Sequence, residues 1–530
     1  MYTYLIRGAQ VVDGAGSPAF FADVAVEAGR IAAVGDLSPA SAKQVVEARG
    51  RVLTPGFLDI HRHADAAVFR PGFGELELRQ GLTTIVSGNC GLSLAPVSGP
   101  WKTKILHYLS PITGQADSKI PIETMEGYLE AVRESAPPLH TGELVGMGTL
   151  RAAAAGYDIQ RLEDSHYTAI HRSLEQALAG GALGVSLGLG YAPECFYTTQ
   201  ELLRALAPLR DSGVPVTVHM RQEGAGVVEA LREMISVARE LRTPVEISHL
   251  KCIGTAYWQK YVPEMLRLLG EAREAGLDIA CDLYPYTAGS TQLLHILPPE
   301  AQTGGTETLT RRLRDQDFRR LLRRRMETGM DFENISALVG FENIVVSTAA
   351  IGAGHALEGL SIAQIAARES KDCFTALFDL LEQERCEVTM IDFIADEADI
   401  ASILQCPFSS LISDSTYPTE GRRHPRVRGA AVRLIETYVR EKGVLSLPQA
   451  IRKLTSLPAS RLGLTGKGRI APGMDADLCL FDPGRLHAAA TYQEPERNAA
   501  GMDWVFVDGI PAIEEGRLTG SRSGRVLRRC

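Results

Sequence analysis

The sequence has no apolar run long enough to span a lipid bilayer, and it has no excess of basic residues. Its 55 Lys and Arg are outnumbered by 64 Asp and Glu, so the formal net charge is −9 at pH 7. A chain of this charge has no general attraction to nucleic-acid phosphates or to anionic lipid. We therefore expect neither nucleic-acid binding nor membrane association.

Signals for export and for disulfide cross-linking are also missing. The first thirty residues lack the basic start and the apolar run of a signal peptide. Nine cysteines are scattered without close pairs or Cys-x-x-Cys spacing, and a chain of 530 residues needs no disulfides to build a core. These features predict a protein of the reducing cytoplasm. The sequence does not predict its oligomeric state.

The two ends of the chain share a β-rich pattern. Residues 4–14 and 22–35 alternate apolar runs with turn residues, and a similar pattern returns at 476–483 and 503–520. A chain of this length favours a large domain with a smaller one. We therefore expect a small β domain assembled from residues 1–56 and 467–530, with a catalytic domain at 57–466 between them.

The middle of the chain alternates short apolar runs with amphipathic helical stretches, which indicates a parallel sheet buried on both faces. Eight such units match an elaborated (β/α)8 barrel, so the predicted fold class is α/β. Residues 300–405 are predicted to be an insertion before the last strand, and the arginine-rich run 309–329 in it has the spacing of a solvated helix. The expected strands lie within 57–63, 83–90, 143–150, 183–191, 214–221, 244–250, 277–286 and 410–415.

Four histidines stand at the expected strand ends. His61 and His63 are separated by one residue, so on a strand both rings point to one face and can share a metal ion. His219 and His249 each end a strand of the same barrel and can converge in its mouth. A single histidine in such a place is usually a hydrogen-bonded core residue. Two pairs at one barrel mouth favour metal binding, because neutral imidazole is a common zinc ligand.

Cys90 and Asp414 also follow expected strands. Cys90 lies between glycines in SGNCGLS, where a thiolate can ligate or bridge a metal, although most free cysteines are small buried apolar residues. Asp414 is the only carboxylate that ends the last expected strand. It can be a ligand or base, or it can simply cap the following turn.

The sequence resembles the N-acyl-D-amino-acid deacylases (D-aminoacylases) of the amidohydrolase superfamily over most of its length, least so at about 300–405. The resemblance implies a metal-dependent-hydrolase (β/α)8 TIM barrel with a β-sandwich built from both termini. The motifs that carry it are TPGFLDIHRHAD, SGNCGLS, GALGVSLGLGYAP, VHMRQEGAGVVEA, PVEISHLKCIG, DLYPYTAGST, HPRVRG and the segment 439–483.

The resemblance also implies roles for single residues. Cys90, His219 and His249 would hold a tightly bound zinc ion, and His61, His63 and Asp414 would form a second, weaker or partly occupied site. Asp414 would also move the reaction's protons. Tyr191 would hydrogen-bond the scissile carbonyl oxygen, which suits a hydroxyl donor. Lys251, Tyr284 and Ser290 would bind the substrate carboxylate, as their charge and hydroxyls allow.

One residue departs from the family pattern. Met147 stands in GMGTLR where the family usually has His, and a thioether can neither shuttle protons nor donate a hydrogen bond. We expect Met147 to pack in or near the pocket. Four arginines after Asp414 can either favour an acidic substrate side chain or form a charged surface: Arg422, Arg423, Arg426 and Arg428.

The predicted function is zinc-dependent hydrolysis of a small molecule, the amide of an N-acyl-D-amino acid, to a carboxylate and a free D-amino acid. One alternative is a cyclic amidase of the hydantoinase or dihydroorotase type, which shares the His-x-His motif and the terminal Asp. A D-terminal dipeptidase and a non-catalytic scaffold are further alternatives. The intact set of six candidate ligands disfavours the scaffold.

Overall fold

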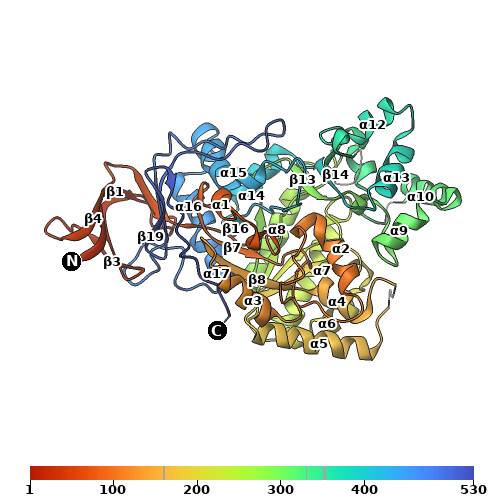
Figure 1. Cartoon of the computed structure of the whole chain (residues 1–530), viewed down its shortest axis with the longest axis horizontal. Helices are drawn as coiled ribbons and strands as arrows, with labels where there is room; N and C mark the ends of the chain where they lie inside the picture. The colour runs from red at the N-terminus through yellow and green to blue at the C-terminus, as the bar shows by residue number, and fades with distance from the viewer. Residues whose placement is uncertain (159–160, 330, 350–353, 530) are drawn as a thin grey trace.

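The computed structural model describes residues 1–158, 161–329, 331–349 and 354–529. The predicted insertion at about 300–405 includes residues 330 and 350–353, which lie outside the described residues, as does Cys530. Within the described part, the strands form sheets of nine, eight and three strands. Figure 1 shows the sheet of the two termini at one end of the molecule, the barrel in the middle and a helical lobe at the other end.

Eight parallel strands form the central barrel, each beside its neighbour in chain order. A bridge between Arg62 and Ser415 joins the two edge strands, so the barrel is nearly closed. Each of the eight predicted runs overlaps one barrel strand, which confirms the predicted fold class. The strands are β6 (Phe57–Asp59), β7 (Leu82–Ser87), β8 (His140–Gly146), β9 (Gly184–Gly188), β10 (Val216–His219), β11 (Val245–Ile247), β12 (Ile279–Leu283) and β16 (Ser409–Leu411).

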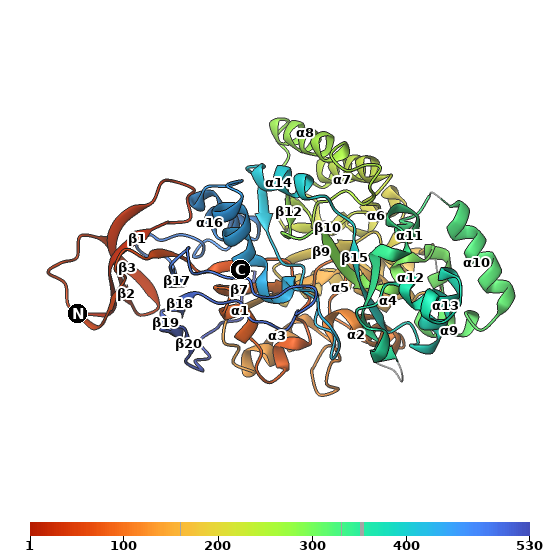
Figure 2. The same cartoon turned by 90° about the horizontal axis from the view of Figure 1, so that it is seen from above.

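Amphipathic helices cover the outside of the barrel. In α7 (Val227–Leu241), for example, Val227, Leu231 and Met234 are buried at helical spacing, and charged residues lie on the other face. Figure 2 shows α7 and α8 side by side along the barrel wall. The helices are α1 (Glu75–Leu78), α2 (Lys102–Thr113), α3 (Met125–Glu134), α4 (Met147–Ala155), α5 (Asp164–Ala179), α6 (Thr199–Ala205), α7 (Val227–Leu241), α8 (Tyr261–Glu274), α14 (Glu397–Gln405), α15 (Arg426–Arg433), α16 (Leu447–Leu454) and α17 (Ser456–Arg461).

Strands from both termini form the nine-stranded sheet. Leu53 of β5 pairs with Leu480 of β17, which joins the two ends of the chain. Tyr4 of β1 and Phe506 of β18 are not on neighbouring strands, yet their rings lie 5.3 Å apart, so the sheet folds over its own core. The strands are β1 (Tyr2–Val11), β2 (Phe20–Glu27), β3 (Arg30–Gly35), β4 (Ala42–Glu47), β5 (Val52–Pro55), β17 (Leu478–Phe481), β18 (Met502–Val507), β19 (Ile510–Glu514) and β20 (Arg517–Leu518).

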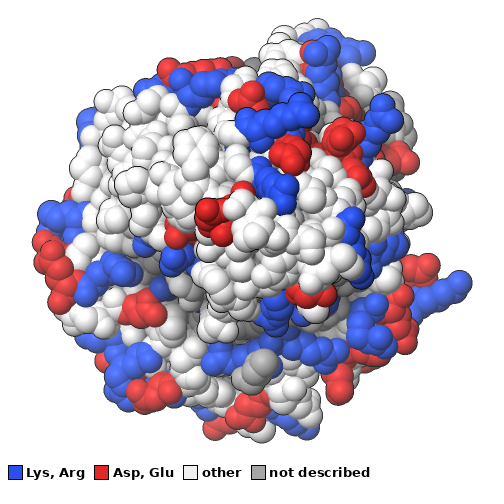
Figure 3. Space-filling view, turned by 90° about the vertical axis from the view of Figure 1, so that its left-hand side faces the viewer, with Lys and Arg blue, Asp and Glu red and all other residues white. Residues whose placement is uncertain are grey.

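The surface of this terminal sheet carries charges of both signs around uncharged areas (Figure 3). Most of the exposed large apolar side chains in the described part of the chain lie here, among them Phe20, Phe21, Val45 and Ile510. None of the helices in the described ranges has the length and apolar character needed to cross a membrane.

A separate lobe, here called the cap, lies between β12 and α14 and covers the barrel mouth. Its antiparallel sheet begins at Ala288, ahead of the predicted insertion. In the arginine-rich helix α10, Leu322 and Met326 are buried while the arginines face acids, as Arg319 does with Asp379. The elements of the cap are β13 (Ala288–Gln292), α9 (Thr306–Arg312), α10 (Gln316–Thr328), α11 (Ile335–Val339), β14 (Ile344–Ala349), α12 (Ile362–Arg368), α13 (Cys373–Gln383) and β15 (Val388–Phe393).

Candidate active site

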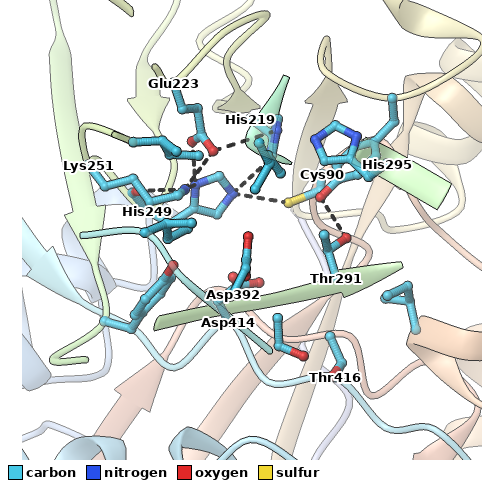
Figure 4. Close-up of a pocket in the computed structure, with 18 of the residues that line it drawn as sticks. Cys90, His219, Glu223, His249, Lys251, Thr291, His295, Asp392, Asp414 and Thr416 are labelled. Atoms are coloured by element: carbon cyan, nitrogen blue, oxygen red, sulfur yellow. Dashed lines mark hydrogen bonds and ion pairs between the residues drawn. The ribbon is translucent and has the colours of Figure 1, made fainter. Parts of the chain in front are cut away.

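A pocket of about 500 Å³, its open mouth included, lies between the carboxyl ends of the barrel strands and the cap. Parallel barrels place their binding groups at this end. Figure 4 shows Cys90, His219 and His249 of the barrel together with Thr291 of β13 and Asp392 of β15, which come from the cap. The predicted site residues that line the pocket are His63, Cys90, Tyr191, His219, His249, Lys251, Tyr284, Ser290 and Asp414.

Six predicted ligands converge in two groups that share Cys90. The first group is His61, His63, Cys90 and Asp414, and the second is Cys90, His219 and His249. Within each group, the possible ligand atoms all lie within 4.8 Å of one another. The fully buried His61 does not line the pocket but lies behind it, with Nε2 3.2 Å from Cys90 Sγ. Sulfur and imidazole donors at this spacing fit one or two zinc-like ions.

The protonation states of three of the candidate histidine ligands are compatible with a bound cation. Burial lowers the pKa of His61 to about 3 and lowers those of His219 and His249, which leaves neutral rings able to donate a lone pair. Burial, followed by the carboxylates of Asp414 and Glu223, raises the pKa of the Cys90 thiol well above its usual range. A bound cation would favour the thiolate instead. Nδ1 of His63 has no hydrogen-bond partner among the described residues.

The backbone is strained at three of these residues. Cys90, His249 and Asp414 have φ angles of 54°, 36° and 51°, in the left-handed region that residues other than glycine rarely adopt. Such strain gathers where side chains must be held in a fixed direction. Here it turns the thiol, the imidazole and the carboxylate into one pocket.

Glu223 is a site residue that the sequence analysis missed. Its buried carboxylate lies 2.7 Å from Nζ of Lys251 and 3.0 Å from Nδ1 of His249 (Figure 4). Despite burial, Lys251 and the two histidines lower the pKa of Glu223, so it is ionised. Its position four residues after His219, in VHMRQEG, was the available signal, but nothing local reveals its contact with Lys251.

Asp414 has two kinds of partner. One carboxylate oxygen lies 3.2 Å from Nε2 of His63 and 3.5 Å from Nε2 of His61. The other lies 2.9 Å from Nη1 of Arg426. Arg426, then the histidines, outweigh burial and lower the pKa of Asp414 well below its usual range, so it is available as a proton acceptor.

The predicted carboxylate-binding groups lie together. Nζ of Lys251 is 6.0 Å from the centre of the Tyr284 ring, and Ser290 enters the pocket from β13. The hydroxyl of Tyr191 is 3.0 Å from Oγ1 of Thr291. The Tyr191 ring packs 4.5 Å from those of His219 and His295, so the hydroxyl is held beside the second ligand group. His295 was not singled out by the sequence analysis.

Met147 and the four arginines lie elsewhere. Met147 is the first residue of α4 and is fully buried, outside the pocket lining, although its neighbours Gly146 and Gly148 pack against Gly91, next to Cys90. None of the four arginines lines the pocket. Arg426 is fully buried, which excludes a surface role for it. The other three contact backbone or side-chain groups outside the pocket: Arg422, Arg423 and Arg428.

Comparisons with known proteins bear on this arrangement. The family model described as "Amidohydrolase family" matches residues 383–512. A D-aminoacylase of Alcaligenes xylosoxydans xylosoxydans is 34% identical over 530 residues, covering 100% of this chain and 98% of the relative. The chain belongs to the D-aminoacylase family of amidohydrolases. It is accordingly a metal-dependent hydrolase that acts on linear amides.

Other relatives are named for different substrates. From the same organism, an N-acyl-D-glutamate deacylase is 34% identical and an N-acyl-D-aspartate deacylase is 32% identical, each covering 99% of this chain, and the chain covers 96% and 94% of them. A crystal structure of a D-aminoacylase superposes with a TM-score of 0.83 at 32% identity, covering 100% of both chains.

Solved relatives also contain metal. One D-aminoacylase structure is described by its binuclear metal centre, and it matches with a TM-score of 0.83 at 32% identity over 100% of both chains. The N-acyl-D-glutamate deacylase of Bordetella bronchiseptica contains zinc and a phosphonate that mimics the tetrahedral intermediate. It matches with a TM-score of 0.84 at 30% identity, again over 100% of both chains.

Proposed function

We propose that this protein hydrolyses the amide bond of N-acyl-D-amino acids and releases a carboxylate and a free D-amino acid. One observation carries the proposal. A buried lysine, Lys251, stands in the same pocket as the two groups of metal-ligand residues. An acylamino acid has an anionic carboxylate near its amide, so it matches a cation beside a hydrolytic centre.

The donor set favours zinc. In this proposal Cys90, His219 and His249 hold the tightly bound ion, and His61, His63 and Asp414 form the weaker site. When bound, the ion supplies Lewis-acid polarisation of the carbonyl and makes water a better nucleophile at neutral pH. The remaining steps belong to the protein's own side chains.

Lys251, Tyr284 and Ser290 bind the substrate carboxylate and orient the amide. Asp414 accepts the proton of the attacking water and returns it to the leaving amine nitrogen, so its charge is unchanged after the cycle. Tyr191 donates a hydrogen bond to the carbonyl oxygen as negative charge develops there. Burial raises the pKa of Tyr191 well above its usual range, which keeps the hydroxyl protonated.

The decisive experiment compares metal-free and zinc-loaded full-length protein on N-acetyl-D- and N-acetyl-L-amino acids. We expect zinc-dependent release of the D-amino acid and little hydrolysis of the L-enantiomer. Cys90→Ala should lose metal and activity together, while Cys195→Ala, outside the ligand groups, should retain both. Full zinc content and full turnover in Cys90→Ala would refute the ligand assignment.

The same zinc-loaded sample tests the alternatives. Turnover of 5-substituted hydantoins without turnover of N-acyl-D-amino acids would identify a cyclic amidase. Exclusive cleavage of D-terminal dipeptides would identify a dipeptidase. Zinc binding with no hydrolysis of any of these substrates would favour a non-catalytic scaffold.

A further inference from the structure

The cap supplies one wall of the pocket and can therefore select the substrate. Gly289 of β13 is paired with Asp392 of β15 in the cap sheet. Both residues line the pocket, as do Ile394, just after β15, and Ile335 of α11. A wall made by an inserted lobe can vary without disturbing the barrel that carries the ligands.

Asp392 has a buried carboxylate on the pocket wall. It is 2% exposed, and among the described residues its Oδ1 has no hydrogen-bond partner and its carboxylate forms no ion pair within 4.0 Å. A Cβ atom on Gly289 would lie 2.9 Å from this oxygen and 3.3 Å from the Tyr284 hydroxyl. The bare backbone of Gly289 thus leaves room for the Asp392 carboxylate beside one of the groups expected to bind the substrate carboxylate. Figure 4 shows Asp392 in the pocket below His249.

The nearby cations are already paired with other acids. Lys251 lies 2.7 Å from Glu223, and Arg426 lies 2.9 Å from Asp414. A second buried acid, Glu333, accepts the backbone N–H of Glu223 behind the pocket. Lys251 is the only Lys or Arg among the described lining residues. A second negative charge on the substrate would meet Asp392 with no cation left to neutralise it.

The wall next to Lys251 is aliphatic. Ile253 follows Lys251 by two residues, and Ile394 Cδ1 lies 2.9 Å from the Cβ position of Gly289. Ile335 completes this wall from the cap. Because the carboxylate and the side chain of an amino acid branch from the same carbon, the wall beside the carboxylate-binding groups faces the side chain. Apolar side chains gain free energy by burial against such a wall.

We propose that the pocket accepts N-acyl-D-amino acids with apolar side chains and that Asp392 excludes those with acidic side chains. This inference rests on the proposed deacylase function. It separates this chain from the relatives named for N-acyl-D-glutamate and N-acyl-D-aspartate. Specificity of this kind comes from repulsion of the wrong substrate as well as from contacts with the right one.

The test is a comparison of kcat/KM values on zinc-loaded full-length protein at pH 8. N-acetyl-D-glutamine and N-acetyl-D-glutamate have nearly the same shape, so their ratio isolates the effect of charge. We expect kcat/KM for N-acetyl-D-glutamine to exceed that for N-acetyl-D-glutamate at least 100-fold. In a wider set that includes N-acetyl-D-lysine, we expect N-acetyl-D-leucine to be the best substrate. Burial raises the pKa of Asp392 to about 6, so pH 8 keeps this carboxylate ionised.

Asp392→Asn removes the charge and nearly preserves the shape. This variant should reduce the ratio of kcat/KM for N-acetyl-D-glutamine to that for N-acetyl-D-glutamate at least tenfold. The main cause should be a higher kcat/KM for N-acetyl-D-glutamate. Asp331→Asn is the matched control, because this cap carboxylate is 75% exposed and pairs with Arg325 outside the pocket. The control should leave the ratio unchanged.

Several outcomes would overturn the inference. The proposed selection would be contradicted if the wild-type protein hydrolysed N-acetyl-D-glutamate as efficiently as N-acetyl-D-glutamine, or N-acetyl-D-lysine more efficiently than N-acetyl-D-leucine. This comparison requires no variant. An unchanged ratio in a folded, zinc-loaded Asp392→Asn protein would remove Asp392 from the explanation. Failure to hydrolyse any N-acetyl-D-amino acid would instead refute the deacylase function, and this inference would fail with it.

Discussion

Nζ of Lys251 lies 2.7 Å from the carboxylate of Glu223, and both groups are buried in the pocket. The lysine expected to bind the substrate carboxylate therefore already has an anionic partner. Burial lowers the pKa of Lys251, but Glu223, followed by Tyr284 and Asp414, together raise it above its usual value, so the lysine stays charged in a buried place. When substrate binds, the ammonium group has donors enough for both carboxylates, because it carries three hydrogens.

The first prediction concerns this lysine. Lys251→Met keeps the aliphatic stem but leaves both Glu223 and the substrate carboxylate unpaired. We expect kcat/KM for N-acetyl-D-leucine to fall roughly 30- to 4,000-fold, which corresponds to a loss of about 2–5 kcal/mol of interaction free energy. N-acyl amines that lack the carboxylate should be poor substrates for both proteins. Lys260→Met, at an exposed position, is the control, and an unaffected Lys251→Met enzyme would contradict the assignment.

The second prediction concerns the contact between the Glu223 carboxylate and His249. Glu223→Gln retains the shape but removes the charge that lies 3.0 Å from Nδ1 of His249. Carboxylates that contact the free nitrogen of a ligand histidine fix its orientation, and their loss typically costs 10- to 100-fold in metal affinity. We expect a weakening of that size in zinc competition with a chelator. Glu229→Gln, on the outer face of α7, should bind zinc normally. Wild-type zinc affinity in Glu223→Gln would show that the contact has no role in holding the ligand.

Asp414→Asn tests the proton transfer. The amide cannot accept a proton from water, and a positioned base typically contributes 10²- to 10⁴-fold in rate. We expect kcat to fall within that range. The metal held by Cys90, His219 and His249 should be retained, as metal analysis of the purified variant would show. A fall of less than about tenfold would count against Asp414 as the base.

Parts of this site were predictable because the evidence for them is local. A strand that ends in His, Cys or Asp at a barrel mouth directs that side chain to the common pocket, so the convergence of His61, Cys90 and Asp414 follows from the order of the strands. For the pairing of β5 with β17, the sequence offered only similar β-rich patterns at the two ends of the chain. The catalytic roles of these residues stay predictions.

Other parts depend on contacts between segments far apart in the sequence. Glu223 precedes an amphipathic helix and has the pattern of a solvated carboxylate, but its partner Lys251 comes from the segment after the next barrel strand, β11. Arg426 is one of four arginines that follow Asp414, none of which lines the pocket, and only the packing of α15 buries it against Asp414. Asp392 lies on a cap strand whose register with β13 no local pattern specifies.

The last prediction concerns the junction between the barrel and the terminal sheet. Asp477, just before β17, accepts hydrogen bonds from Lys467 at 2.6 Å and from the backbone N–H of Asp508 at 2.8 Å. Its carboxylate also lies 2.9 Å from Nε2 of His140 on barrel strand β8. The side chains of Lys467, Asp477 and His140 are buried, so loss of the charge leaves Lys467 with the 3.1 Å contact to Asp475 as its one ion pair among the described residues. Breaking one partner of a buried ion pair typically costs about 3–5 kcal/mol.

We therefore expect Asp477→Asn to lower the free energy of unfolding by about that amount at pH 7, as measured by denaturant titration. His140 and Lys467 outweigh burial and lower the pKa of Asp477 in the folded protein. Near pH 4 the unfolded chain thus binds the proton more readily than the folded one, and wild-type stability from this group falls as the pH falls. The difference between wild type and variant should shrink below about pH 4. Glu515→Gln, an exposed carboxylate in the turn after β19, should change stability by less than about 0.5 kcal/mol. A difference that stays constant or grows on acidification would mean that the charge of Asp477 does not hold this junction together.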